Sequence, residues 1–120
     1  MRIAATITKE GFITELPEGP YIVIFDTDKK DAEKYDNPGF PLKDGRRNAV
    51  VDLFIDKKVD IVITVPEAFC DMSYGKAKKN GIRFIRLEES LPYENVIENL
   101  STYLNYIASE IPEDELFKRK

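Results

Sequence analysis

The stretch that decides the fold is Val59-Asp60-Ile61-Val62-Ile63-Thr64-Val65, near the middle of the chain. It is apolar almost throughout, and such a run predicts a strand that is covered on both faces. Pro66 follows directly and ends the strand, because proline lacks the N–H that a central strand must donate. We therefore expect one buried strand here, with the rest of the sheet built around it.

Helices are predicted on either side of this strand. Before it, Asp44 can cap a helix that runs to about Asp56. The apolar stripe of that helix consists of Ala49, Val50, Leu53 and Phe54. After the strand, a weaker helix is expected over residues 69–79, ended by Asn80-Gly81, and residues 82–87 form the next strand. Strands that alternate with helices predict right-handed crossovers and parallel pairing.

Three short apolar segments precede this part of the chain, at residues 2–8, 12–16 and 21–25. Short turns join them, so we expect an antiparallel meander. Residues 26–44 then form a long polar connection with one candidate short strand over residues 32–35. Connections of this length are often functional, and an ordered surface loop with an edge strand is an equal alternative.

The clearest helical spacing begins at Pro92, which suits the first turn of a helix. Apolar residues then recur at three- and four-residue steps, as Val96, Ile97, Leu100, Tyr103, Leu104, Ile107 and Ile111. This spacing predicts a single helix that ends near Ile111. Residues 112–120 are expected to form a charged tail.

These elements predict an α/β fold with a mixed five-stranded sheet, flanked by about three helices. Three antiparallel strands are followed by two parallel strands, as in ribonuclease H-like folds. The chain has 120 residues, of which 42% are hydrophobic, which is enough for one core. We place a single domain at residues 1–111, followed by the tail at 112–120.

Composition narrows the classes of partner and compartment. With 18 basic and 22 acidic residues, the chain carries a net charge of −4, which disfavours nucleic acid as a partner. No window approaches the roughly 18 apolar residues of a membrane span, and no signal peptide is recognisable. The single cysteine, Cys70, excludes an intrachain disulfide. We expect a cytoplasmic protein without a membrane partner.

Histidine is absent, and this restricts catalysis more than any other feature of the composition. Its absence removes Ser-His-Asp and Cys-His catalytic devices and the commonest transition-metal ligand. Two-metal nuclease chemistry would need several carboxylates on one face, the principal one on the first strand. That strand carries no acid, and Asp26 alone does not suffice. We therefore expect a binding or carrier module and not an enzyme.

The strongest candidate for ligand binding is Asp44-Gly45-Arg46-Arg47-Asn48, at the start of the first predicted helix. A helix N-terminus presents free backbone N–H groups and partial positive charge, and Gly45 lets a ligand approach closely. Arg46 and Arg47 add charge and forked donors for a carboxylate or phosphate. The alternative is an ordinary capped helix whose arginines pair with nearby acids.

Two further places are candidates for binding residues. Thr64 lies near the carboxyl end of the buried strand and Cys70 follows the strand, at the edge where open α/β sheets bind ligands. Cys70 could ligate a soft metal or an iron–sulfur species as a thiolate, or it could be a small buried apolar residue. Gly11 and Thr14 form a weaker third candidate, on the approach to the second expected strand.

The order and spacing of several short motifs resemble one known family. These motifs are Gly11, Pro20-Tyr21, Asn37-Pro38, Gly45-Arg46, Val59 to Ile63, and Asn80-Gly81-Ile82. Over roughly residues 1–100 the chain resembles the dinitrogenase iron–molybdenum cofactor biosynthesis proteins, which include NifX-like proteins and the accessory domain of NifB. The most specific part is the stretch from Gly45 to Phe54 that runs into Val59 to Ile63.

The resemblance implies a ribonuclease H-like fold without nuclease activity. It also implies a carrier of an iron–sulfur or iron–molybdenum cofactor precursor, whose anionic charge would suit Gly45 and Arg46. Many members carry a histidine in a Ser-Glu-His-Phe-Gly-like segment, where this chain has Thr14-Glu15-Leu16-Pro17-Glu18-Gly19, and Val65-Pro66-Glu67 replaces their usual glycine. The alternative function is a protein-interaction or regulatory domain that keeps the fold and has lost the ligand.

Overall fold

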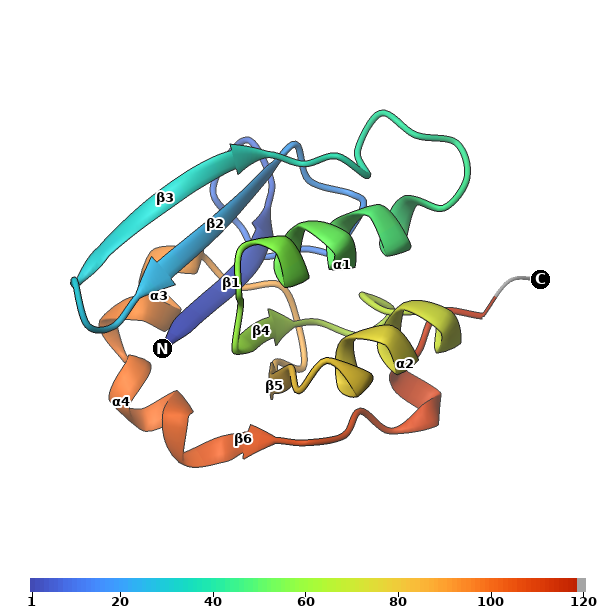
Figure 1. Cartoon of the computed structure of the whole chain (residues 1–120). Helices are drawn as coiled ribbons and strands as arrows, with labels where there is room; N and C mark the ends of the chain where they lie inside the picture. Colours follow the sequence, from blue (N-terminus) through green and yellow to red (C-terminus); the bar gives the residue numbers. More distant parts are fainter. Residues whose placement is uncertain (119–120) are drawn as a thin grey trace.

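A computed structural model describes residues 1–118 of the chain. It contains one mixed sheet of six strands, in the order β3-β2-β1-β4-β5-β6 (Figure 1). The strands are β1 (Arg2–Ile7), β2 (Tyr21–Asp26), β3 (Asp31–Asp36), β4 (Ile61–Thr64), β5 (Arg83–Arg86) and β6 (Ile107–Ala108). β1, β2 and β3 pair antiparallel, β1, β4 and β5 pair parallel, and β6 returns antiparallel to β5. The mixed α/β sheet predicted from the sequence is confirmed.

The predicted count of five strands is wrong, because both edges of the sheet were misjudged. β3 covers all of residues 31–36, where we expected at most a short strand in a connection. β3 is exposed along nearly its whole length. It therefore has no apolar face, and its sequence lacks the pattern that predicts a strand. At the other edge, Ile107 pairs with Ile85 and Ala108 with Phe84 to form β6.

The predicted strand over residues 12–16 is also wrong. This segment makes only isolated bridges, between Ile13 and Ile7 and between Phe12 and Pro92. Gly11, at φ 90°, turns the chain sharply, and the N–H of Ile13 then donates to the carbonyl of Leu91 at 2.8 Å. The segment therefore packs against the loop after β5, which leaves β2 as the antiparallel neighbour of β1.

Residues 1–118 contain four α-helices, where about three were expected. They are α1 (Arg46–Asp56), α2 (Asp71–Lys79), α3 (Tyr93–Glu98) and α4 (Leu100–Tyr103). α1 and α2 lie side by side, and α3 and α4 lie away from this pair (Figure 1). Each of the two long helices follows one strand of the sheet and precedes the next, as right-handed crossovers require.

The single helix predicted from Pro92 to Ile111 is interrupted. At Asn99 the backbone leaves helical geometry (φ −112°, ψ 25°), and the Asn99 side chain donates to the carbonyl of Asn95 at 2.8 Å. Such a local side-chain bond competes with the helical ladder. After α4 and a 3₁₀ turn over Leu104–Tyr106, the chain extends into β6. The apolar spacing therefore serves two helices and a strand.

The core lies between the sheet and its helices. β1 and β4 are buried almost completely, and Phe69 packs edge-on against Phe84 with ring centroids 5.3 Å apart. In the segment after Ile111, Leu116 is buried, and the N–H of Phe117 donates to the carbonyl of Phe69 at 2.7 Å. The last two residues of the predicted tail, 119 and 120, lie outside the described residues.

None of the helices in residues 1–118 is both long enough and apolar enough to cross a membrane.

Candidate functional site

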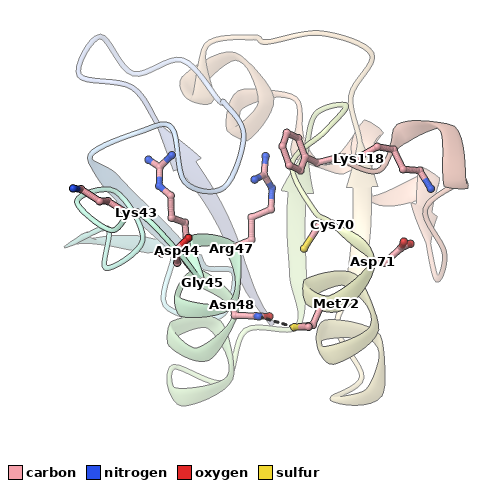
Figure 2. Close-up of a pocket in the computed structure, with 11 residues that line it drawn as sticks. Lys43, Asp44, Gly45, Arg47, Asn48, Cys70, Asp71, Met72 and Lys118 are labelled. Carbon is pink, nitrogen blue, oxygen red and sulfur yellow. Dashed lines mark hydrogen bonds between the residues drawn. The ribbon is translucent and has the colours of Figure 1, made fainter. Parts of the chain in front are cut away.

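A pocket of about 750 Å³ lies where the N-terminal ends of α1 and α2 meet (Figure 2). We call it the interhelical pocket. Its lining residues are Lys43, Asp44, Gly45, Arg46, Arg47, Asn48, Cys70, Asp71, Met72, Phe117 and Lys118. The two helices begin at the same edge because each follows a strand of the sheet. The pocket brings together five of the eight predicted site residues.

The start of α1 leaves its first amides open. Gly45 is the N-cap in the left-handed conformation (φ 63°, ψ 23°), and its side-chain-free backbone provides no capping group. The first helical hydrogen bond runs from the N–H of Ala49 to the carbonyl of Gly45. The amides of the three residues between them have no acceptor within residues 1–118. The prediction that Asp44 caps this helix is wrong, because the left-handed turn places Gly45 at that position.

The start of α2 is closed by its own side chains. Cys70 is the N-cap, and its backbone N–H donates to Ser73 Oγ at 2.9 Å. Cys70 Sγ lies 3.2 Å from the same oxygen. Burial raises the pKa of the Cys70 thiol, but hydrogen bonds from Ser73 and the Met72 backbone, with the nearby charge of Arg47, outweigh it. The net result is a pKa below the ordinary value, which favours the thiolate.

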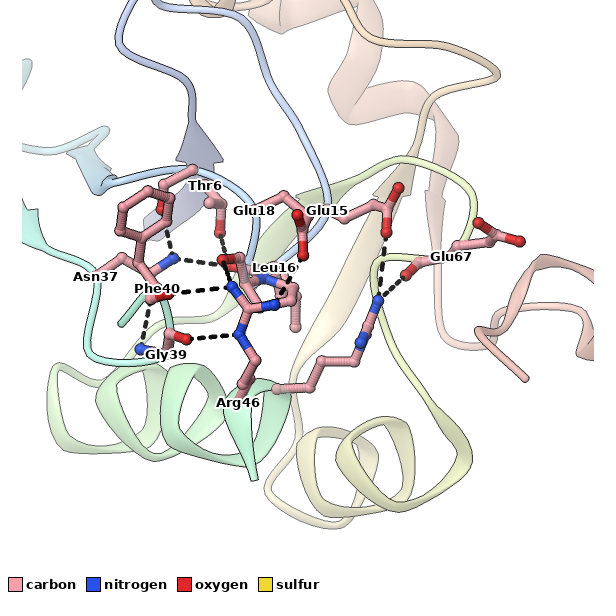
Figure 3. A network of polar contacts seen from close by, with 12 residues as sticks. Thr6, Glu15, Leu16, Glu18, Asn37, Gly39, Phe40, Arg46 and Glu67 are labelled. Carbon is pink, nitrogen blue, oxygen red and sulfur yellow. Dashed lines mark hydrogen bonds and ion pairs between the residues drawn. The ribbon is translucent and has the colours of Figure 1, made fainter. Parts of the chain in front are cut away.

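Arg46 lines the pocket, and its guanidinium joins two loops (Figure 3). Its guanidinium donates to the carbonyls of Gly39 at 3.0 Å, Phe40 at 3.1 Å and Pro17 at 2.8 Å. A further bond, 3.0 Å long, reaches the carboxylate of Glu18. Because this side chain already makes four N–H···O bonds, it contributes positive charge to the pocket but few free hydrogen-bond donors.

Arg47 joins the start of α1 to the loop that precedes α2. It donates to the carbonyl of Ala68 at 3.0 Å and of Glu67 at 2.9 Å, and to the carboxylate of Glu15 at 3.3 Å. Its guanidinium lies 4.0 Å from the centre of the Phe117 ring. Burial lowers the pKa of Arg47, and the acids around it partly offset that effect. Both arginines thus pair with local acids, as the alternative interpretation of this motif predicted.

Asn48 faces α2 across the pocket. Its side-chain Nδ2 donates to Met72 Sδ at 3.1 Å (Figure 2), while its Oδ1 is buried with no partner in the described part of the chain. Met72 is 70% exposed. Sequence analysis missed Met72, because its partner Asn48 is 24 residues away in the sequence.

Three predicted site residues lie elsewhere. Gly11 is in the turn after β1, where its carbonyl accepts from the N–H of Tyr93 at 2.9 Å. The backbone of Thr14 bonds to Thr6 at 3.0 Å. Thr64 is buried at the end of β4, and its hydroxyl donates to the carbonyl of Val65 at 3.2 Å. None of these three lines the interhelical pocket.

The donors around the pocket do not fit a protein-ligated iron–sulfur cluster. Within residues 1–118 no group of three or more histidine, cysteine, aspartate or glutamate side chains is placed to hold a metal. Such clusters are ordinarily held by several cysteine thiolates, and the chain has one cysteine. The open amides of α1 instead fit an anion that is held by hydrogen bonds.

No model of a protein family matches this sequence, and no curated protein matches it. Its fold is similar to those of known structures, including the two that follow. The apo form of the orange protein from Desulfovibrio gigas is 17% identical with a TM-score of 0.72, over 84% of this chain and 87% of that one. A putative NifB protein from Thermotoga, of the DUF35 family, is 19% identical with a TM-score of 0.68, over 99% of this chain and 97% of that one.

Proposed function

We propose that this protein is a non-enzymatic binding or carrier module whose interhelical pocket takes a small anionic ligand. The observation that carries the proposal is the meeting of two helix N-termini at one pocket, where the first amides of α1 have no acceptor within residues 1–118. Each helix N-terminus acts as roughly half a positive charge, and open amides there bind oxyanions.

The charges that line the pocket support this ligand class. Four lining residues are cationic (Lys43, Arg46, Arg47 and Lys118) and two are acidic (Asp44 and Asp71). The chain as a whole carries a net charge of −4. Arg46, Arg47 and Lys118 each pair with a carboxylate outside the lining, so the support for an anion comes from Lys43 and the open amides of α1.

An anionic metallocofactor is the ligand that the family resemblance favours. The fold shared with a putative NifB protein supports that resemblance, and the apo form of the orange protein implies a second, ligand-bound form of that protein. The strand order around β1 supports the ribonuclease H-like assignment, which we retain as part of the proposal. Such a cofactor would be held here through its own negative charge, by the α1 amides.

Calorimetric titration with inorganic phosphate tests the anion site. We expect saturable binding to the wild type that Asn48→Asp weakens by about tenfold or more, because the new carboxylate repels an anion within a few ångströms. The matched control is Asn105→Asp, which makes the same change at an exposed position outside the pocket. Equal phosphate affinity for all three proteins, or no binding, would contradict the proposal.

Elemental analysis of the protein as purified tests the metallocofactor. We expect molybdenum or iron to copurify with the protein under anaerobic conditions. A colourless protein that contains neither metal would remove the metallocofactor and leave only a simpler anion.

The second candidate function is that of a protein-interaction domain. Phe40 and Leu42 are 45% and 43% exposed, close together on the loop between β3 and α1. Neighbouring exposed apolar side chains are typical of contact surfaces. A pull-down that recovers one stable partner with the wild type, and loses it with Phe40→Ser, would favour this function over ligand binding.

A further inference from the structure

Residues 112–117 run across the carboxyl ends of β4 and β5, and we call them the strap (Figure 1). A 3₁₀ turn over Glu113–Glu115 brings the strap back toward the start of α2. Phe117 then pairs with Cys70 in a parallel bridge, and its ring lies 4.0 Å from the guanidinium of Arg47. Because Phe117 lines the interhelical pocket, the strap supplies part of the wall of that pocket.

The strap is fastened to the loop before α2 and to the end of β5. The carbonyl of Glu115 accepts from the N–H of Glu67 at 2.7 Å, and the N–H of Phe117 donates to the carbonyl of Phe69 at 2.7 Å. The carboxylate of Glu115 also accepts two hydrogen bonds from the guanidinium of Arg86. Glu115 therefore joins the strap to two different elements of the sheet edge.

Little of the strap is buried. Leu116 is 5% exposed, and it is the only buried side chain in residues 112–117. The ion pair between Arg86 and Glu115 is partly exposed, so it adds little to stability. Segments with few buried side chains open at a lower free-energy cost than the core does. Burial of Leu116 is therefore the main interaction that keeps the strap closed.

The loop that the strap holds is strained. Glu67 has φ 68°, in the left-handed region that side chains other than glycine rarely adopt. Such a conformation persists only where neighbouring groups enforce it, and the hydrogen bond from Glu67 to Glu115 is one such constraint. This loop also carries the carbonyls of Glu67 and Ala68 that accept from Arg47. Opening of the strap would therefore release the loop that positions Arg47 as well as the Phe117 ring.

We propose that the strap is a gate of the interhelical pocket. It opens as a unit while the rest of the fold stays intact, and its opening takes Phe117 out of the pocket wall. The open form admits larger molecules than the closed form does, and it exposes the Cys70 thiol beside Phe117. The inference deepens the proposed function and rests on it in one respect, since the gate would regulate access to the proposed binding pocket.

Amide hydrogen exchange and thiol labelling measure the gate on the full chain. The amides of Glu67 and Phe117 bond across the strap, so we expect them to share one protection factor, lower than that of the β1 amides. Fluorescein maleimide, a bulky reagent, should label Cys70 through the same opening. Leu116→Ala removes the buried side chain of the strap, so both exchange and labelling should become about tenfold faster or more.

The matched control is Leu100→Ala, the same substitution at a residue 8% exposed in α4, which lies away from the strap (Figure 1). It should lower global stability and leave strap exchange and Cys70 labelling unchanged. Glu115→Gln weakens the contact with Arg86 without a change in the core. It should speed both processes by about twofold to fivefold.

The gate is wrong if Glu67 and Phe117 exchange as slowly as the β1 amides. It is also wrong if Leu116→Ala and Leu100→Ala speed the labelling equally, because the strap would then open only when the whole protein unfolds. Calorimetric titration with inorganic phosphate keeps the two proposals apart. Phosphate binding without separate opening of the strap would overturn the gate and leave the anion site standing. Separate opening without phosphate binding would support the gate and contradict the anion function.

Discussion

The N-termini of α1 and α2 face the same pocket, but one is uncapped by any side chain and the other is capped. α1 begins at a glycine that offers no side chain, so its first amides stay open within the described structure. α2 begins at Cys70, which shares a reciprocal set of hydrogen bonds with Ser73. One helix start thus presents N–H donors and the other presents a polarised thiol. The anion that we propose would therefore bind at the start of α1 and not at the start of α2.

Arg47 ties these two helix starts together, and its loss should have the largest effect. Arg47→Ala removes three hydrogen bonds and leaves the carbonyls of Glu67 and Ala68 without their donor. We expect a loss of about 2 to 4 kcal/mol in the free energy of unfolding, measured with urea. Lys43→Ala, which removes an exposed cation from the same pocket, should change stability by less than about 0.5 kcal/mol. Equal losses for both variants would show that Arg47 does not link the two starts.

The two helices should respond oppositely to the same glycine substitution. A Cβ at Gly45 or at Gly75 meets nothing within 4 Å, so sterics do not distinguish them. Gly45 has φ 63°, and Gly45→Ala should cost about 1 to 2 kcal/mol because of the left-handed backbone. Gly75 lies inside α2, and Gly75→Ala should stabilise by about 0.5 to 1 kcal/mol. Thermal unfolding that shifts in the same direction for both would contradict this account of the α1 start.

Removal of the α2 cap should cost less and should also change the thiol. Ser73→Ala takes away the acceptor of the Cys70 amide and the hydrogen bond to its sulfur. We expect the free energy of unfolding to fall by about 1 kcal/mol and the pKa of the Cys70 thiol to rise. The pH dependence of alkylation with iodoacetamide measures the thiol pKa. Ser101→Ala, at an exposed position in α4, should leave both properties unchanged. An unchanged thiol pKa in Ser73→Ala would show that the hydrogen bonds of Ser73 do not lower the pKa of Cys70.

The smallest effect is the pH dependence of stability that Cys70 contributes. The pKa of the folded thiol lies below its ordinary value. Ionisation therefore stabilises the folded state above the ordinary pKa of a thiol, and this contribution is lost as pH falls through the folded pKa. Urea unfolding at a series of pH values should show this difference between wild type and Cys70→Ser. A difference that grows as pH falls would have the wrong sign.

The strands that could be predicted from the sequence are those whose residues are buried and therefore apolar. β4 and β5 were found because Ile61 to Thr64 and Phe84 to Ile85 are buried, and buried strands are apolar runs. β3 escaped because its residues are mostly exposed and charged. The strand is held by backbone hydrogen bonds to β2, and these bonds leave no pattern in the side chains. The long predicted helix failed at Asn99 for a related reason, since one local side-chain bond outweighed a regular apolar spacing.

The site was predicted in part for the same physical reason. Gly45 and Cys70 each begin a helix that follows a strand, so sequence order alone places them at one edge of the sheet. The directions of Arg46 and Arg47 could not be predicted, because their acceptors are loop carbonyls distant in the sequence. Residues of the segment after Ile111 reach the pocket only through tertiary packing, as Phe117 does beside Arg47.

The measurement that tests the central claim most directly is a map of amide ¹H–¹⁵N shifts during titration with inorganic phosphate. The account predicts large, saturable downfield shifts for the amides of Arg46, Arg47 and Asn48, which have no acceptor within residues 1–118. Ser73, whose amide is already bonded to Cys70, should move little. Shifts of equal size at the starts of α1 and α2, or shifts concentrated outside the interhelical pocket, would contradict it.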